Sequence, residues 1–112
     1  MQLGNFFMPG SVAIVGASRS SAKIGHVILK NIIDGGFKGH VFPVNPEARE
    51  ILGYRCYKSV GEISVEVSLV VIAVPAEFVL DVIDQCHSKK IKDVIIVTAG
   101  FGEVGNIKLE LK

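Results

Sequence analysis

The sequence lacks a long uninterrupted stretch of apolar residues. Its longest apolar run covers residues 69–76, eight residues that include Pro75. A helix that crosses a membrane needs about 20 residues of this kind in succession. The sequence therefore predicts no membrane-spanning helix.

A surplus of charge of one sign is also missing. Lys and Arg total 12 and Asp and Glu total 11, so the formal net charge is +1. Proteins held on nucleic acid or on an anionic membrane by general electrostatic attraction carry a surplus of basic residues. We therefore expect neither nucleic acid nor a membrane among the partners of this chain.

Cysteine is scarce. Cys56 and Cys86 are 30 residues apart, and this spacing fits no zinc or CxxC motif. The two could form one disulfide, but we expect two buried thiols, because free cysteine is among the most buried residue types. No Lys or Arg precedes Arg19, so the basic start of a secretion signal is missing. Both observations predict a reducing, cytoplasmic setting.

Recognisable catalytic patterns are absent as well. The sequence has no GxSxG elbow and no pair of carboxylates at a spacing that suggests acid–base catalysis. Its histidines are isolated and fit no metal pattern, so each is expected to be structural or exposed; they are His26, His40 and His87. We predict no catalytic and no metal-binding residue in this chain.

The chain does contain a regular alternation of apolar runs and helical patterns. Runs rich in β-branched residues predict strands at 11–16, 40–45, 68–74 and 93–100. Apolar residues at helical spacing predict helices at 24–33, 75–90 and 103–112. Shorter features are expected between the second and third strands: a helical turn at 47–52, an extended piece at 54–60 and a turn at 62–64.

This alternation predicts the fold class. Parallel strands need crossover connections, so strands that alternate with helices form a parallel sheet covered by helices. We predict an α/β fold, a Rossmann-like parallel sheet of about four to five strands with helices on both faces. Pro43 lacks a backbone N–H, so we expect part of its strand to lie near an edge of the sheet or to bend. Because 112 residues suit one domain and no glycine or proline closes the last predicted helix, we expect residues 1–112 to be a single domain, the N-terminal fragment of a longer chain.

Small and turn-forming residues follow every predicted strand. Open parallel sheets bind ligands at the carboxyl ends of their strands, so these residues predict a binding crevice. They are Gly16, Ala17, Ser18 and Arg19 after the first strand, Asn45 and Pro46 after the second, Val74 and Pro75 after the third, and Thr98, Ala99 and Gly100 after the fourth.

The loop at 16–25 is the most informative of these strand ends. It brings hydroxyls and cations to a helix N-terminus, which binds phosphate through its free N–H groups. These side chains are Ser18, Ser20, Ser21, Arg19 and Lys23. The glycine spacing is neither GxGxxG nor a P-loop. An NAD site requires an acidic residue at the end of the second strand, where this chain has Asn45, so NAD is disfavoured but stays an alternative.

Several short segments, taken in order, are more specific than any single glycine motif. They are FMPGSVAIVGAS (7–18), NIIDGGFKG (31–39), VFPVNP (41–46), ILGY (51–54), VPAEF (74–78) and TAGFGE (98–103). Together they resemble the CoA-binding domain of NDP-forming acyl-CoA synthetases, the domain that also begins the α subunit of succinyl-CoA synthetase.

The resemblance implies that the chain binds coenzyme A. Ser18, Arg19, Ser20 and Ser21 would contact the CoA phosphates, Val74 and Pro75 would flank the adenine or the pantetheine path, and Thr98, Ala99 and Gly100 would line the route toward the thiol. Many relatives carry a lysine just after the Asn-Pro or Thr-Pro of the second strand end. Here Glu47 and Ala48 stand there, so either Arg49 or Lys23 would substitute for that lysine, or CoA would bind more weakly.

The resemblance also implies a parent enzyme, an acid–thiol ligase that interconverts acyl-CoA, ADP and phosphate with the acid, CoA and ATP. Mg-ATP or ADP and the phosphorylated histidine would belong to the remaining synthetase domains or to an ATP-grasp β subunit, so the fragment alone would be inactive. Two alternatives remain: a stand-alone CoA-binding carrier or regulatory protein, and an NAD-binding Rossmann domain.

Overall fold

The computed structural model describes residues 10–98 and 105–110, and for the last stretch it describes the backbone. The larger elements are β1 (Ser11–Val15), α2 (Ile24–Asp34), β2 (His40–Val44), β5 (Leu69–Ile72), α3 (Ala76–Ser88), β6 (Asp93–Thr98) and β7 (Gly105–Glu110). Between β2 and β5 lie three short elements: β3 (Glu50–Ile51), β4 (Tyr54–Arg55) and the 3-10 helix η1 (Val60–Glu62).

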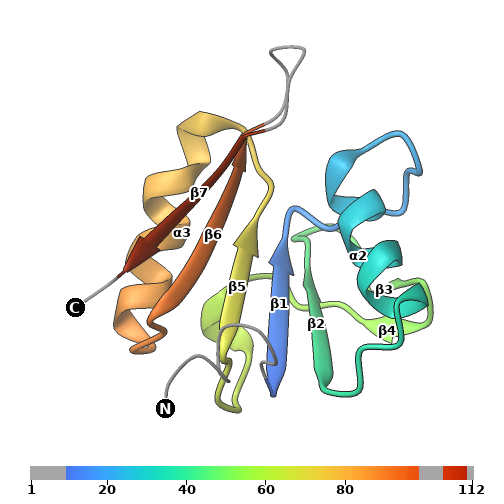
Figure 1. The fold of residues 1–112 in the computed structure, drawn as a ribbon, viewed down its shortest axis with the longest axis horizontal. Helices are drawn as coiled ribbons and strands as arrows, with labels where there is room; N and C mark the ends of the chain where they lie inside the picture. The colour runs from blue at the N-terminus through green and yellow to red at the C-terminus, as the bar shows by residue number, and fades with distance from the viewer. Residues whose placement is uncertain (1–9, 99–104, 111–112) are drawn as a thin grey trace.

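Five strands form one sheet in the order β2-β1-β5-β6-β7 (Figure 1). The first four are parallel to one another, and β7 is antiparallel to β6. The predicted α/β, Rossmann-like parallel sheet is therefore confirmed, with one antiparallel strand added at its edge. The edge position predicted for the strand that contains Pro43 is confirmed too, because β2 ends the sheet on the other side.

Helices cover both faces of the sheet, as predicted. Alternate residues of β1 point to opposite sides, so Ala13 and Val15 pack with Val82 of α3, whereas Ile14 packs with Leu29 of α2. In Figure 1, α2 lies on the β1–β2 side and α3 on the β6 side. The central strands β1 and β5 are buried on both faces, which explains why apolar residues dominate them.

Two predicted elements are wrong. Residues 47–52 were expected to form a helical turn, but Glu50 and Ile51 belong to a small hairpin of β3 with β4. The helix expected at 103–112 is replaced by β7, which pairs with β6 from Gly105 opposite Thr98 to Glu110 opposite Asp93. Ile107 and Leu109 alternate with polar residues, which suits a strand, and the edge of β6 offers it unpaired backbone groups.

Both cysteines are buried free thiols, as predicted. Burial raises the pKa of Cys86 to about 11 and also raises the pKa of Cys56. None of the helices in the described part of the chain is long and apolar enough to cross a membrane. Across residues 10–98, no three His, Cys, Asp or Glu side chains gather in a way that could hold a metal ion.

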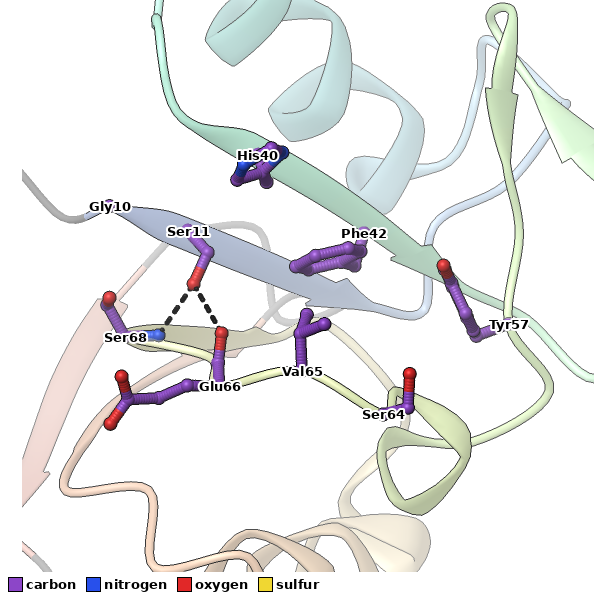
Figure 2. A pocket seen from close by; sticks show the side chains of 9 residues that line it. All are labelled: Gly10, Ser11, His40, Phe42, Tyr57, Ser64, Val65, Glu66 and Ser68. Atoms are coloured by element: carbon purple, nitrogen blue, oxygen red, sulfur yellow. Dashed lines mark hydrogen bonds between the residues drawn. The ribbon is translucent and has the colours of Figure 1, made fainter.

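A cavity of about 460 Å³ lies at the amino ends of β1, β2 and β5 (Figure 2). Ser11 lines this cavity and makes two hydrogen bonds through its hydroxyl. The hydroxyl donates to the Glu66 carbonyl at 3.0 Å and accepts the Ser68 N–H at 2.9 Å. These bonds fasten the segment before β5 to the start of β1. They account for the buried hydroxyl of Ser11 at the end of the sheet opposite to the predicted crevice.

Candidate functional site

The carboxyl ends of β1, β2 and β5 meet at one end of the sheet. Val15 is in register with Val44 on one side and with Ile72 on the other. Backbone bonds continue this pairing past the strands, from the Gly16 N–H to the Val44 carbonyl at 3.1 Å and from the Ala73 N–H to the Val15 carbonyl at 2.8 Å. The three loops that follow these strands are therefore held side by side.

Two glycines let the first loop close tightly. Gly16 has φ +95°, and a Cβ placed on it would lie 2.3 Å from the Ala73 carbonyl oxygen. Gly25, in the first turn of α2, packs so closely on the loop that its Cβ would lie 1.9 Å from the Gly16 carbonyl oxygen. The N-terminus of α2 thus lies directly against the end of β1, as a phosphate-binding strand–turn–helix requires.

A cavity of about 240 Å³ opens at this junction, and we call it the strand-end crevice. It is lined by Gly16, Ser18, Lys23, Ile24, Gly25, Asn45, Ala73, Val74 and Pro75. Lys23 is the N-cap of α2 and makes no capping bond through its side chain. The first turn of a helix leaves amide N–H groups without intrahelical partners. Hydroxyl, ammonium and amide donors therefore converge here in the combination that binds phosphate.

A second cavity, of about 330 Å³, adjoins the first and shares four of its residues: Gly16, Asn45, Val74 and Pro75. We call it the apolar cavity because most of its remaining wall is hydrocarbon. Those other residues are Val15, Val44, Pro46, Lys58, Ser59, Val60, Phe78, Asp81, Val82 and Gln85. The two cavities meet at the four residues that they share and together reach from the α2 N-terminus to the first turns of α3.

The structure separates Arg19 from the strand-end crevice. Arg19 lines a neighbouring cavity of about 670 Å³ together with Arg49 and residues of the β3–β4 hairpin, among them Leu52. Ser20 and Ser21 are exposed on the loop and lie outside these three cavities. The side chains predicted to hold phosphate are therefore divided between two places.

Ala17 differs from its prediction in orientation. It was predicted to be part of the binding crevice, but its side chain is fully buried against the α2 side of the sheet, in the same apolar cluster as Leu29. Its carbonyl accepts a hydrogen bond from Nδ2 of Asn45 at 2.9 Å. Ala17 is therefore inaccessible to a ligand, and its role in the structure is to hold the first loop through the bond from Asn45.

Asn45 and His26 both fasten the loops of the site. Besides its bond to Ala17, Asn45 accepts the Glu47 N–H at Oδ1, at 2.7 Å. Nδ1 of His26 lies 2.7 Å from the Ser18 carbonyl oxygen, so it donates there. His26 is buried, and the structural role expected for it is confirmed.

Part of the predicted site is outside the described residues. Ala99 and Gly100 lie there, and Thr98 is described through the backbone as the last residue of β6. Conversely, the sequence analysis missed Phe78, Asp81 and Gln85 of the apolar cavity. Successive intervals of three, three and four residues separate Pro75, Phe78, Asp81 and Gln85. This spacing places the three side chains on one face of a helix that starts at a strand end, and it is the signal that could have found them.

Comparison with known proteins places this geometry in a family. Residues 10–106 match the family described as a CoA binding domain. The ADP-forming acetate–CoA ligase of Methanocaldococcus jannaschii is 47% identical over 104 residues, which are 93% of this chain and 14% of the ligase. The α subunit of ADP-forming acetate–CoA ligase I of Pyrococcus furiosus is 46% identical over 109 residues, covering 94% of this chain and 24% of the subunit.

Solved structures agree with these matches. The dinucleotide-forming acetyl-coenzyme A synthetase 1 of Ca. Korarchaeum cryptofilum superposes with a TM-score of 0.84 at 43% identity, over 89% of this chain and 22% of that one. A conserved hypothetical protein of Pyrococcus furiosus superposes with a TM-score of 0.71 at 38% identity, over 77% of this chain and 72% of that one. The chain thus spans 14 to 24% of the two ligases and most of a smaller protein. It belongs to the family of CoA-binding domains and matches the N-terminal part of ADP-forming acyl-CoA synthetases.

Proposed function

We propose that this chain binds coenzyme A along the path formed by the strand-end crevice and the apolar cavity. The observation that carries the proposal is the shared wall of the two cavities, made of Gly16, Asn45, Val74 and Pro75. One end of this path offers donors for phosphate and the other offers apolar surface. CoA has the same division, because its phosphates are joined to an adenine on one side and to a pantetheine arm on the other.

The phosphates are bound at the α2 N-terminus. Ser18 and Lys23 line the crevice there, beside the amides of Ile24 and Gly25. Lys23 therefore takes the place of the family lysine that is missing after Pro46. Arg19 and Arg49 face the neighbouring cavity, where they attract a further phosphate. Ser20 and Ser21 contribute at the exposed edge of the loop.

The chain acts within a larger enzyme, as a single domain of an ADP-forming acyl-CoA synthetase that joins an acid to CoA with ATP. Support comes from the two ligases, of which the chain matches 14% and 24%. The remaining synthetase domains, or an ATP-grasp β subunit, hold Mg-ATP and carry the phosphoryl group. This chain binds and orients CoA but turns nothing over alone, because the backbone amides and hydroxyls of the crevice supply no general base near neutral pH. The buried free thiols suit a cytoplasmic setting.

A second candidate is a stand-alone CoA-binding carrier or regulator. It is favoured by the smaller Pyrococcus furiosus protein, of which this chain covers 72%. The full open reading frame separates the two candidates, because several hundred further residues are needed for a synthetase. Coenzyme A is the ligand in both cases.

The test is a calorimetric titration of the chain with CoA and with NAD. We expect CoA to bind more tightly, because Asn45 stands where an NAD site needs an acid. Lys23→Ala is expected to weaken CoA binding about tenfold, the lower range for a bond to a charged group, since Lys23 is exposed. Lys30→Ala is the matched control, because Lys30 is paired with Asp34 further along α2. Tighter binding of NAD, or equal effects of the two lysine variants, would overturn the proposal.

A further inference from the structure

We infer that Asp81 recognises the amino group of the adenine of CoA and makes the apolar cavity selective for a 6-aminopurine. This inference rests on the proposed function, since it assumes that CoA binds along the path described above. It adds a residue on α3 that determines which base is accepted. The argument comes from the shape of the cavity, from the bonds that hold Asp81, and from the chemistry of the base.

The walls of the cavity suit a flat aromatic ring. Val60 and Val82 are buried in the core below it, and Val74 with Pro75 continues from the phosphate end. Phe78 completes the wall, and 53% of its surface is exposed. Aromatic side chains gain from stacking or edge contacts with a second ring. A base placed here covers this exposed ring.

Asp81 is held in place by a relay through Gln85. Nε2 of Gln85 donates to Oδ2 of Asp81 at 3.1 Å. Oε1 of the same Gln85 accepts the Val60 N–H at 3.0 Å, which links α3 to η1 across 25 positions of the chain. The carboxylate is exposed, and it is positioned at the cavity by Gln85, whose other end is anchored on the Val60 N–H. Its Oδ1 atom and remaining lone pairs are available to a ligand.

The polar groups of the cavity match one edge of adenine. An ionised carboxylate only accepts hydrogen bonds, so Asp81 pairs with a donor such as the adenine amino group. Lys58 and Ser59 line the same cavity and donate, which suits the ring nitrogens beside that amino group. Lys58 is the other charged residue of the lining, and its ammonium group cannot accept from the amine. Asp81 is therefore the charged group of this cavity that can distinguish adenine from a purine without the 6-amino group.

The experiment compares CoA with its 6-deamino analogue, in which purine replaces adenine. Both are titrated by calorimetry into the wild-type chain, Asp81→Ala and Asp84→Ala. Asp84 is the matched control, because it is an exposed aspartate on the same helix that does not line the cavity. Removing either aspartate changes the net charge equally, so the ratio of the two affinities isolates the amino group. Circular dichroism checks folding, and Asp81→Ser provides a second variant.

We expect the wild type and Asp84→Ala to bind CoA about tenfold more tightly than the analogue, the lower end for a bond to a charged group. In Asp81→Ala and Asp81→Ser, this ratio should fall to within about twofold. An equal ratio in all proteins, or a wild type that binds both ligands alike, overturns the inference and leaves CoA binding intact. A wild type that binds neither ligand overturns the proposed function itself.

Discussion

Gly25→Ala is expected to separate the N-terminus of α2 from the loop that it packs against. The added Cβ would lie 1.9 Å from the Gly16 carbonyl oxygen and 3.1 Å from the Ala17 amide nitrogen. Contacts of a Cβ below 3.0 Å essentially do not occur, so the first distance must grow by more than an ångström. The contacting atoms belong to the backbone, so no side chain can rotate to make room.

The size of the effect follows from two opposing contributions. Overpacking costs about 1–3 kcal/mol, and the upper value applies because two backbone segments must separate. Alanine gains about 1 kcal/mol over glycine within a helix. The net loss is about 2 kcal/mol, which lowers the Tm of a domain of this size by about 8 °C. CoA affinity should fall by at least about tenfold, because binding groups need to be held within about 0.5 Å.

Thermal unfolding and calorimetric titration with CoA measure the two effects. Gly61→Ala in η1 is the control, because the nearest atom to its added Cβ is Ser59 Oγ at 3.8 Å. The control should keep both the Tm and the affinity of the wild type. A Gly25→Ala protein with wild-type stability and wild-type CoA affinity would refute the close packing of helix and loop as the basis of the site.

Three other perturbations follow from the structure. Leu52 has φ +52°, a backbone conformation that costs leucine about 1 kcal/mol. Leu52→Asn should therefore raise the Tm by about 4 °C. A decrease in the Tm would contradict this reasoning. The exposed helical Leu80 is its control, since Leu80→Asn should not stabilise the protein. Ala17→Leu should lose about 1–3 kcal/mol in urea unfolding, because its side chain is buried rather than facing the ligand; unchanged stability would contradict that. Cys86 has a folded-state pKa raised from 9.0 to about 11, so it holds its proton more tightly than the unfolded chain does. Its contribution to stability is complete below pH 9 and is lost as the pH rises toward 11, which urea unfolding at pH 8 and pH 10 should detect.

The parallel strands could be predicted because burial on both faces leaves a strong signal in the sequence. Residues 69–72 are all apolar and all buried, and the β1 residues 11–15 are buried throughout. A central strand that is covered on both faces is apolar throughout, so its sequence lacks the regularly spaced polar residues of a surface helix. The position of β2 at the edge followed equally directly from Pro43, which has no N–H to donate.

The β3–β4 hairpin was missed because its turn has unusual residues. A two-residue hairpin turn with positive φ normally contains Asn-Gly or Asp-Gly. Here Leu52 and Gly53 take φ values of +52° and +84°, and a leucine in the first place does not resemble that signal. The cross-strand pair of Glu50 with Arg55 becomes visible as a pair of opposite charges once the register is known. Short strands of two residues carry too little pattern to be predicted separately.

The site could be predicted in part. Gly16, Ser18, Lys23, Asn45, Val74 and Pro75 were predicted from strand ends, and they do line one crevice. The direction of a side chain in a tight loop depends on local φ and ψ, which the order of residues does not specify. Ala17 therefore follows the end of β1 as the sequence indicates, but it is buried in the core and lines neither cavity. Arg19, two residues further, turns toward the hairpin that the sequence analysis had missed.

The bonds of Asn45 have a consequence for how the ligand preference of this fold could change. Its amide must donate to the Ala17 carbonyl while its carbonyl accepts the Glu47 N–H. Aspartate at this position would accept the second bond but could not make the first, and its negative charge would face the Ala17 carbonyl oxygen. The single replacement that would introduce a dinucleotide-type acid therefore breaks the side-chain bond between the β2 loop and the β1 loop, while the backbone bond from Gly16 to Val44 remains. A change from CoA to NAD would therefore need a compensating donor beside Ala17 as well as the acid.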